Sequence, residues 1–316
     1  MELSRETKRK NHSLKNRIRL YRALYVMLLP GLFFLIVYKF IPLYGILIAF
    51  KDFNIFLGDN PFQAISLSPW IGLSHFRRLF NMPDFGHVLV NTLVINSIKI
   101  LFLFPLPILT AIMLNEIRSR VYKKLTQTLI YIPYFFSWVV VFGIFYSFLG
   151  SQGMINSLFT SLGLPTVSFF TDRSIFRGLL VVTEGWKENG WYTIIYLSAI
   201  TGIDSQLYEA AKIDGASKFR QILHVTLPGL FSTIVLMLIM KVGYILDTGF
   251  EQILVMYNPT VYSVADVIQT YVYRIGLGQM DFSLGTALGL FNSVIAFVLI
   301  VGSNAISKKM VQRSIW

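Results

Sequence analysis

Long apolar stretches constrain this chain more than any other feature of its sequence. A helix needs about 20 mostly apolar residues to cross the hydrocarbon core of a bilayer. Only 14% of the residues are charged, whereas soluble domains carry about 25%. We therefore expect an all-α membrane protein with six transmembrane helices, at residues 23–50, 87–114, 125–149, 175–203, 229–246 and 282–306.

The positions of the cations predict how the chain is oriented in the membrane. Lys and Arg are concentrated in the N-terminal segment, in residues 118–124, in residues 212–220 and in the C-terminal tail. Loops rich in Lys and Arg stay on the cytoplasmic side, so both termini are predicted to be cytoplasmic. The same distribution explains the net charge of +12. It does so without nucleic-acid binding, because the sequence shows no basic face with interleaved aromatic residues.

These features divide the chain into three parts. A basic cytoplasmic segment precedes a six-span transmembrane domain, and a short cytoplasmic tail follows it. The first apolar stretch is longer than the roughly 7–15-residue core of a signal peptide, so we interpret it as a retained span. The predicted boundaries of the three parts are 1–22, 23–306 and 307–316.

The sequence lacks the patterns of the common enzyme sites. It contains no cysteine, which excludes thiolate metal sites and thiol nucleophiles. It contains no Gly-x-x-x-x-Gly-Lys-Ser/Thr loop that could hold the phosphates of ATP. We therefore expect a transport protein with no catalytic site, metal or cofactor of its own. A secondary transporter or channel is the alternative class, although the inverted repeat typical of many secondary transporters is not evident.

A polar segment between the fourth and fifth predicted spans has the pattern of a helix, a turn and a second helix. Glu209, Ala210 and Ala211 favour a helix, and Gly215 permits a sharp turn after it. Pro228 cannot donate a backbone hydrogen bond and therefore suits the start of the next element. Residues 204–228 are thus predicted to form a helix–turn–helix at the cytoplasmic face. By its physics alone, this segment is either an ordinary connector or a docking element for a soluble partner.

This segment resembles the EAA loop of the permease subunits of ABC importers. That loop begins with Glu-Ala-Ala, and a Gly follows after three intervening residues. After nine more residues comes a group of four, namely an aliphatic residue, any residue, Leu and Pro. The corresponding positions here are 209–211, 215 and 225–228, with Val225 in place of the usual Ile. Four other stretches are similar to the sugar permeases that import oligosaccharides derived from polysaccharides, namely residues 41–45, 49–53, 186–191 and 249–254.

The resemblance implies a function and a set of partners. Such a permease forms a translocation path by alternating access in the cell membrane, often of a Gram-positive bacterium. It assembles with a second permease subunit, usually a homologous different chain, and with a dimer of ATP-binding subunits that holds ATP and Mg²⁺. An extracellular substrate-binding protein delivers the oligosaccharide. The EAA loop forms a coupling helix seated in the ATP-binding subunit, which implies contact residues at Glu209, Ala210, Ala211, Asp214, Gly215, Leu227 and Pro228.

Ionisable residues inside the predicted spans indicate a polar interior. Such residues are costly in hydrocarbon and usually face a bundle interior or a cavity. Lys99 and Lys241 lie near the middle of their spans, and Glu184, Lys187 and Glu188 lie at the centre of the fourth span. Two interpretations stay open, because the lysines either pair with the glutamates of the fourth span or line a hydrated path for sugar. The lysines would also suit a uronic acid as substrate.

Sugar sites combine hydrogen-bonding side chains with aromatic rings, and the fourth span offers both. Its Gly185 and Gly190 are predicted to let the helix break or kink. The tyrosine-rich outer loop, residues 247–281, is expected to receive the binding protein. The candidate residues of the substrate path are Trp186, Glu188, Asn189, Trp191, Tyr192, Lys99, Lys241, Tyr134, Trp138 and Asn292.

Overall fold

A computed structural model describes residues 21–243, 245–246 and 249–311. Residues 1–20 of the predicted N-terminal segment and residues 312–316 of the predicted tail lie outside this part. The described residues contain helices and no strand, with one isolated antiparallel bridge between Lys51 and Trp70. The all-α prediction is therefore confirmed for the described part of the chain. The chain divides into two compact units, Met1–Gly72 and Leu73–Trp316.

The first unit contains one long helical segment followed by a short helix. The long segment changes from α-helix to π-helix to 3₁₀-helix along its length, and none of its first 19 described helical residues is buried within the chain. A helix that is apolar on all sides belongs in a membrane or in a protein core, which agrees with the predicted first span. The elements are α2 (Arg22–Leu35), η1 (Ile36–Phe40), η2 (Ile41–Phe50) and α3 (Pro61–Leu67).

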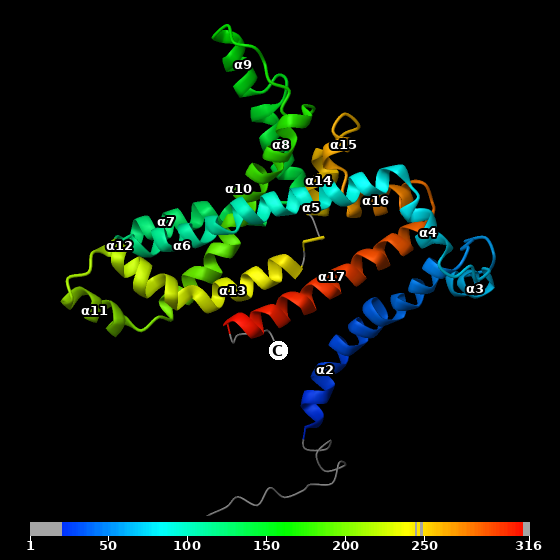
Figure 1. Ribbon diagram of the computed structural model, residues 1–316, viewed down its shortest axis with the longest axis horizontal. Coiled ribbons are helices and arrows are strands. Elements are labelled where there is room, and N and C mark those ends of the chain that lie inside the picture. The colour runs from blue at the N-terminus through cyan, green and yellow to red at the C-terminus, as the bar shows by residue number, and fades with distance from the viewer. Residues whose placement is uncertain (1–20, 244, 247–248, 312–316) are drawn as a thin grey trace, which may run out of the picture. The chain divides into compact units, whose positions relative to one another are not determined.

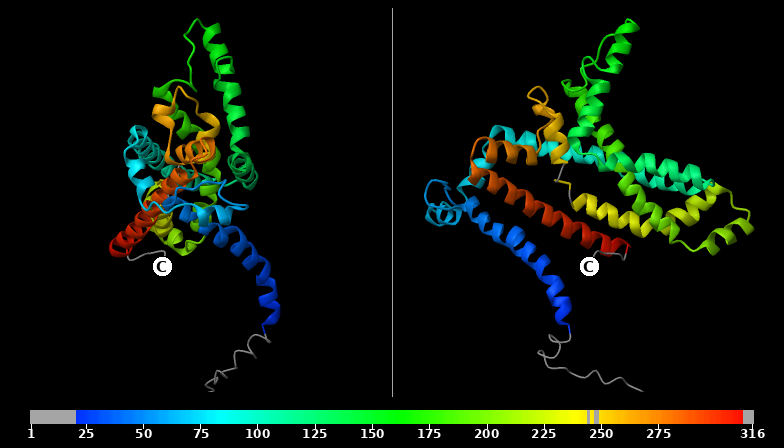
Figure 2. Two further views of the ribbon diagram at one scale, coloured as in Figure 1. Left: turned by 90° about the vertical axis from the view of Figure 1, so that its right-hand side faces the viewer. Right: turned by 180° about the vertical axis from the view of Figure 1, so that it is seen from behind.

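The second unit is a bundle of long helices connected by short ones (Figures 1 and 2). The long α10 packs against α6 and α13, and α13 packs against α17. The helices α8 and α9 project from one side of this bundle (Figure 1). The elements are α4 (Ser74–Phe80), α5 (Pro83–Leu103), α6 (Pro105–Glu116), α7 (Arg120–Tyr131), η3 (Ile132–Phe135), α8 (Trp138–Leu149), α9 (Met154–Ser161), α10 (Arg173–Thr201), α11 (Ser205–Ile213), α12 (Lys218–Gln221), η4 (Ile222–Thr226), α13 (Leu227–Gly243), α14 (Phe250–Met256), α15 (Tyr262–Ala265), α16 (Ile268–Tyr273), η5 (Arg274–Gly278) and α17 (Phe282–Val311).

Within the part of the chain that the structure describes, five helical segments are long and apolar enough to cross a membrane. The fourth predicted span is α10, which is a continuous helix of 29 residues. It is long enough to cross a bilayer, but it is not one of the five apolar segments because it has charged residues at its centre. The five apolar segments are Arg22–Phe50, Pro83–Glu116, Trp138–Ser161, Lys218–Gly243 and Phe282–Ala305.

The third predicted span requires a correction. The sequence predicted a continuous helix over residues 125–149, but the chain is not helical at Phe136 and Ser137. Pro133 lies in the first turn of η3 and lacks a backbone donor, which favours the end of the α-helix there. Ser137 then begins α8 by accepting a hydrogen bond from the backbone N–H of Val140 at 3.4 Å. The third span is therefore broken between η3 and α8.

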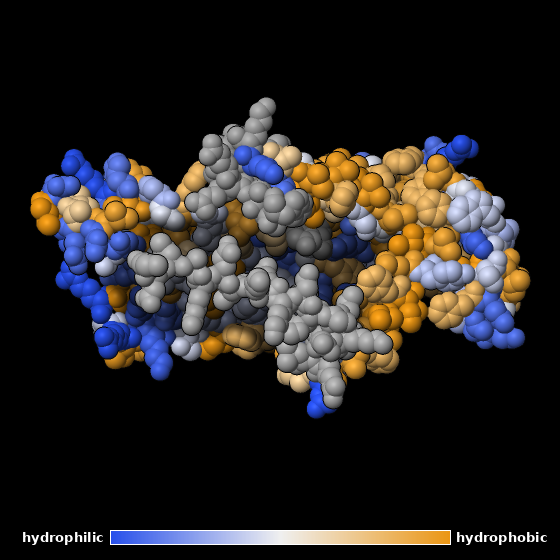
Figure 3. All heavy atoms as spheres, turned by 90° about the horizontal axis from the view of Figure 1, so that it is seen from below, coloured by the Kyte–Doolittle hydropathy of each residue, from blue (hydrophilic) through white to orange (hydrophobic). Residues whose placement is uncertain are grey.

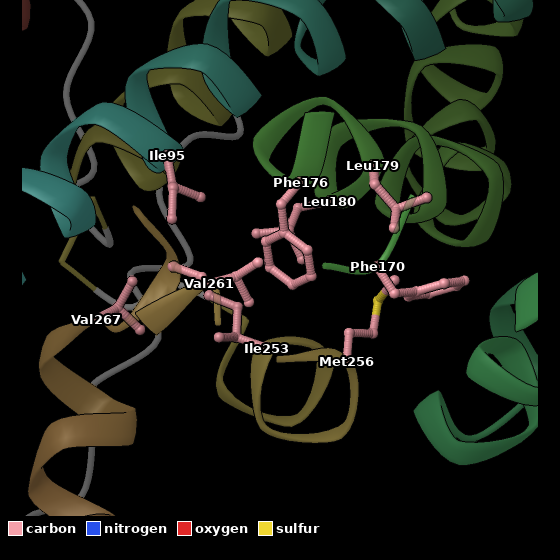
Figure 4. Close-up of a cluster of buried hydrophobic side chains, with 10 residues drawn as sticks. Ile95, Phe170, Phe176, Leu179, Leu180, Ile253, Met256, Val261 and Val267 are labelled. Carbon is pink, nitrogen blue, oxygen red and sulfur yellow. The ribbon is translucent and has the colours of Figure 1, made fainter. Parts of the chain in front are cut away.

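Three clusters of buried apolar side chains hold the second unit together. One cluster joins α10 to α14 and α15 through Phe176, Leu180 and Ile253 (Figure 4). A second joins α6, α10 and α13, and includes the fully buried Leu230. A third joins α4, α5, α16 and α17. Because α10 belongs to two of these clusters, its position is fixed on both sides, and its polar residues are held in a defined place.

Candidate functional site

Lys99 of α5 and Glu184 of α10 form a buried ion pair. Nζ of Lys99 lies 2.5 Å from Oε2 of Glu184 and donates to Oε1 of Gln252 at 2.7 Å. Gln252 in turn donates to the carbonyl oxygen of Leu180 and to Oγ1 of Thr183, at 2.7 and 2.8 Å. A buried charge is tolerated when it is paired and hydrogen-bonded, as Lys99 is here. This network joins α5, α10 and α14, and it confirms internal pairing for Lys99.

Lys187 of α10 is held at the break in the third span. Its Nζ donates to the carbonyl oxygen of Tyr134 at 3.0 Å and lies 3.3 Å from Oε1 of Glu188. It also lies over the rings of Tyr134 and Trp138, at 5.0 and 5.3 Å from their centroids. Irregular backbone at membrane depth needs partners from the protein or from a water-filled cavity. Lys187 supplies such a partner, and its positive charge suits the carboxyl end of a helix.

Gly185 and Gly190 do not break α10, although the sequence-based prediction allowed a break there. The helix is continuous through Gly185 and Gly190. A Cβ on Gly190 would lie 2.9 Å from Cα of Tyr131, and nearer still to the carbonyl oxygen of Ile130. A Cβ on Gly185 would lie 2.9 Å from Cδ2 of Leu103. These glycines therefore allow neighbouring helices to approach α10 closely.

A cavity of about 470 Å³ opens between α5, α10 and α13. Its volume falls in the range of roughly 300–1,000 Å³ that is usual for small-molecule sites. Trp191 lies on its wall and stacks on Tyr134, with ring centroids 4.8 Å apart and planes 9° from parallel. The lining residues are Asn96, Lys99, Ile100, Leu103, Phe104, Glu184, Trp191, Tyr192, Ile195, Met237, Met240, Lys241 and Gly249.

The structure brings several of the predicted path residues to this cavity and leaves others away from it. Lys99, Lys241, Trp191 and Tyr192 line it directly. A smaller cavity of about 20 Å³ is lined in part by Glu188 and Asn189, together with Tyr192 and Lys241. Tyr134 contributes through its stack on Trp191. These residues come from the second, third, fourth and fifth predicted spans.

Besides Tyr134, three predicted path residues are not among the lining residues of either cavity. Trp186 is 39% exposed and packs against the rings of Phe136 and Phe145. Trp138 is buried beneath Lys187. Asn292 lies in α17, where its Oδ1 is buried with no hydrogen-bond partner among the described residues.

Sequence reasoning missed several lining residues, namely Asn96, Met237, Met240 and Gly249. Gly249 belongs to one of the stretches that resemble the sugar permeases, and its backbone is left-handed with φ of 37°. For Asn96, Met237 and Met240, the sequence offers only their spacing from the predicted lysines as a signal. Asn96 lies about one helical turn before Lys99, and the two methionines lie within a turn of Lys241.

The segment between α10 and α13 folds as the predicted helix–turn–helix. Gly215 adopts a left-handed backbone with φ of 73° between α11 and α12. The hydroxyl of Tyr208 lies 3.0 Å from that of Thr226, which ties α11 to η4. Lys218 forms an ion pair of 2.8 Å with Glu116 at the end of α6. Pro228 is the second residue of α13, as predicted, and η4 leads into that helix without a break.

The predicted contact residues of this segment lie mainly on its surface. Glu209, Ala210, Asp214 and Gly215 are exposed, as is Pro228. Ala211 is half-buried, and Leu227 packs against the buried cluster of α6, α10 and α13. Figure 3 shows hydrophilic residues gathered at the end of the second unit where α11 and α12 lie.

Two large apolar side chains in this hydrophilic region were missed by the sequence-based prediction. Ile213 is 86% exposed and Phe219 is 73% exposed. They lie on the two sides of the turn at Gly215. An apolar residue inside an otherwise charged segment is a signal that could have found them. Exposed apolar residues rimmed by polar ones are typical of a protein contact surface.

The described part of the predicted outer loop, residues 249–281, contains a partly buried ion pair. Asp266 is buried and forms a hydrogen-bonded ion pair with Arg274, and it also accepts from Oγ1 of Thr270 at 2.8 Å. Burial raises the pKa of the Asp266 carboxyl, while the hydrogen bond from Thr270 and the charge of Arg274 oppose that rise. Burial and the neighbouring Tyr262 raise the pKa of Tyr257 to about 12. Its phenol is therefore protonated at neutral pH.

Two residues of the bundle hold this loop in place. Nη2 of Arg177 donates to Oδ1 of Asn91 at 2.7 Å, and Nε of Arg177 donates to the carbonyl oxygen of Val264 at 3.0 Å. Nδ2 of Asn91 donates to the carbonyl oxygens of Ser263 and Asp266, at 3.1 and 3.2 Å. The loop is therefore bound to both α5 and α10 through its backbone.

Comparison with known proteins identifies relatives over most of the chain. Residues 104–313 match the family described as "Binding-protein-dependent transport system inner membrane component". The chain is 44% identical to Protein LplB of Bacillus subtilis (strain 168) over 93% of this chain and 91% of that protein. It is also 44% identical to the polygalacturonan/rhamnogalacturonan transport system permease protein YteP of the same organism, over 93% and 90% of the two chains.

Two solved structures are similar in fold and in sequence. One is a crystal structure of a bacterial ABC transporter involved in the import of the acidic polysaccharide alginate, with 38% identity, a TM-score of 0.85, and coverage of 94% of this chain and 99% of that chain. The other is a crystal structure of a bacterial alginate ABC transporter in complex with an alginate pentasaccharide-bound periplasmic protein. It has 37% identity, a TM-score of 0.86, and coverage of 96% and 100%.

Proposed function

Because the chain belongs to the family of binding-protein-dependent transport system inner membrane components, we propose that it is the permease subunit of an ATP-driven importer of oligosaccharides. The observation that carries this proposal is the cavity of about 470 Å³. Its wall contains the ion pair of Lys99 and Glu184, the ammonium group of Lys241, and the rings of Trp191 and Tyr192. The relatives named for polygalacturonan and alginate transport support the choice of substrate class.

The proposed topology has six spans, with α10 as the fourth. Its polar residues have partners on α5, η3 and α14, so the polar side of α10 faces its neighbours rather than lipid. Both termini lie in the cytoplasm, and the chain is a multi-pass protein of the cell membrane, which the two Bacillus relatives support for a Gram-positive organism. The proposed parts are a cytoplasmic segment at 1–22, a permease domain at 23–306 and a cytoplasmic tail at 307–316.

The proposed path for the sugar runs through the main cavity. The rings of Trp191 and Tyr192 line it, and aromatic rings suit the apolar C–H surfaces of a sugar ring. Glu188 and Asn189 supply hydrogen-bonding groups in the smaller cavity beside it. Tyr134 supports the ring of Trp191 from behind. Trp138, Trp186 and Asn292 do not line either cavity and are not part of this proposed path.

The proposed coupling element is the surface formed by α11, the turn at Gly215 and α12. Glu209, Ala210, Ala211, Asp214 and Gly215 contact one subunit of a separate ATP-binding dimer, which holds ATP and Mg²⁺. Ile213 and Phe219 are the apolar anchors of the same contact, because both are largely exposed here. Leu227 and Pro228 connect this surface to α13, so movement of the ATP-binding subunit reaches the wall of the cavity through that helix.

The remaining partners complete an alternating-access cycle. A second permease chain, homologous to this one, faces the cavity, and an extracellular substrate-binding protein docks on the outer loop, residues 247–281. ATP binding closes the dimer and opens the path outward, the sugar enters, and hydrolysis resets the path. Coupling free energies of about 1–3 kcal/mol are enough to shift such a conformational equilibrium substantially.

The coupling role is tested by substitution at the exposed turn. The variants Ile213→Asp and Gly215→Pro should each abolish co-purification of the ATP-binding subunit and sugar-stimulated ATP hydrolysis. Ile213 is 86% exposed, so an Asp there leaves the fold of this chain intact. Gly215 has φ of 73°, whereas Pro fixes φ near −65°. The measurement is affinity purification in detergent after co-expression with the neighbouring genes, followed by an ATPase assay.

Leu164→Asp is the matched control. Leu164 is 51% exposed and lies beyond α9, on the opposite side of the proposed membrane from α11, so its variant should retain the ATP-binding subunit. A chain that purifies alone in every case, and transports sugar without ATP, would contradict the proposal and favour a secondary transporter. Retention of the ATP-binding subunit and stimulated hydrolysis by both turn variants would contradict only the coupling role.

A further inference from the structure

The three lysines at the centre of the helical bundle differ in how their charges are balanced. Lys99 is paired with Glu184 at 2.5 Å. Lys187 lies 3.3 Å from Glu188 and caps the carbonyl oxygen of Tyr134. Lys241 has no carboxylate within ion-pair distance among the residues that the structure describes, and its Nζ lies over the ring of Tyr192 at 4.3 Å. Lys241 is therefore the lysine of this group that lacks a carboxylate partner.

The charge of Lys241 faces the cavity. Lys241 lines both the main cavity and the smaller one beside it, where Glu184 and Glu188 also lie. Each of those glutamates is already engaged by another lysine. Among the residues that the structure describes, this group has three cations and two carboxylates, which leaves one positive charge in excess. An uncompensated charge at membrane depth is costly and usually marks a substrate or ion pathway.

We propose that Lys241 binds a carboxylate of the transported oligosaccharide, so that this chain selects acidic sugars, the uronate class, over neutral ones. This inference rests on the proposed function and specifies the substrate of the same cavity. Trp191 and Tyr192 cover the faces of the sugar, and the ammonium group of Lys241 forms an ion pair with its carboxylate. The ring of Tyr192 holds the ammonium group in place while the cavity is empty of sugar, since cation–π contacts stabilise a partly desolvated cation.

The geometry favours a carboxylate over a phosphate. A phosphate monoester carries about −1.5 to −2 charges at neutral pH. Sites that recognise phosphate commonly use the two-pronged guanidinium of arginine. The described residues that line the cavity include no arginine and a single lysine without a carboxylate partner. One ammonium group matches one carboxylate, and a single such contact is weak enough for release on the cytoplasmic side.

The test compares acidic and neutral probes of the same length. The complete complex, with its partner chains, is placed in nanodiscs, and binding of trigalacturonate and trimannuronate is measured by calorimetry. Each is compared with the neutral trisaccharide made by reducing its carboxylates. A hydrogen bond to a charged group contributes about 1.5–3 kcal/mol, which corresponds to about a tenfold to hundredfold preference for one of the acidic probes.

The variants assign the preference to Lys241. Lys241→Gln should bring the acidic and neutral probes to within about twofold of each other, and Lys241→Arg should keep most of the preference because it keeps the charge. The exposed Lys124 of α7 gives the control variant Lys124→Gln, which removes the same charge outside the cavity and should bind as the unmodified chain does. Equal co-purification of the partner chains shows that each variant folds.

The possible contrary results distinguish a failure of the Lys241 inference from a failure of the proposed function. Neutral probes that bind as tightly as acidic ones, or a preference that Lys241→Gln leaves unchanged, would overturn this inference while the proposed function stands. If none of the four probes binds or is taken up by the complex, both this inference and the proposed import of oligosaccharides are overturned.

Discussion

Lys99, Lys187 and Lys241 have the same side chain in three different surroundings. The sequence indicated lysines at membrane depth and carboxylates on the fourth span, and it allowed either pairing between them or a hydrated path for sugar. It left open which lysine meets which glutamate, because the pairing depends on how α5, α10 and α13 are rotated about their axes. The contact of Lys99 with Gln252 of α14 was equally inaccessible, because α14 lies in a loop that is distant in sequence. The residue types were predictable, but their partners were not.

The first residue-scale prediction concerns the ion pair of Lys99 and Glu184. Glu184→Gln leaves the ammonium group of Lys99, which is 5% exposed, without its carboxylate. Breaking a buried pair from one side costs about 3–5 kcal/mol, whereas replacing both partners by neutral residues is often close to neutral. We therefore expect Glu184→Gln to lower the Tm of the detergent-solubilised complex, and the double variant Lys99→Met, Glu184→Gln to recover most of the loss.

The control for this cycle is Lys124→Met, which removes an exposed lysine of α7 and should leave the Tm unchanged. A double variant that is as unstable as the sum of the two single variants would show that Lys99 and Glu184 act independently, and the buried pair would then not stabilise the bundle.

At the scale of the element, α10 combines features that the sequence predicted with one that it did not. Its length and polar centre were predicted from residues 175–203. Its continuity through Gly185 and Gly190 was not predicted, because the sequence does not distinguish a glycine that breaks a helix from one that lets a neighbouring helix pack closely. The break between η3 and α8 was also missed, although Pro133 and Ser137 are the residues that end one helix and begin the next. The apolar run across this break concealed it.

Gly190→Ala tests whether close packing of α7 on α10 supports the site. The new Cβ would lie 2.9 Å from Cα of Tyr131, and backbone atoms there cannot move without displacing α7. Overpacking of this kind costs about 1–3 kcal/mol, so we expect a lower Tm and a loss of sugar uptake as Tyr134 is moved from Trp191. Gly178→Ala is the matched control in the same helix, because a Cβ there meets nothing within 4 Å.

Since alanine has a higher helix propensity than glycine by about 1 kcal/mol, Gly178→Ala should keep or slightly raise the Tm. If both glycine variants showed the same uptake and the same Tm, close packing at Gly190 would be contradicted. Gly190 would then be interpreted as a flexible point in the helix.

At the scale of the whole molecule, apolar runs predict helices well because the bilayer demands a minimum length of apolar helix. The five apolar segments match the first, second, third, fifth and sixth predicted spans, with the third shifted toward its carboxyl-terminal half. Their side chains are often exposed, as Leu101 and Phe297 are at 67% and 68%, which suits lipid. The cavity could not be predicted in the same way, since three helices must be placed together before it exists.

The central claim is that this chain moves oligosaccharide only when ATP and a binding protein are both supplied. The most direct measurement is uptake of labelled trigalacturonate, trimannuronate and their carboxyl-reduced counterparts into proteoliposomes that contain the complete complex. ATP and Mg²⁺ are enclosed on the side of α11, and the binding protein is added on the side of the outer loop. We predict uptake of at least one probe when both are present, and none when either is left out. Uptake driven by an ion gradient alone, without ATP or binding protein, would contradict the account.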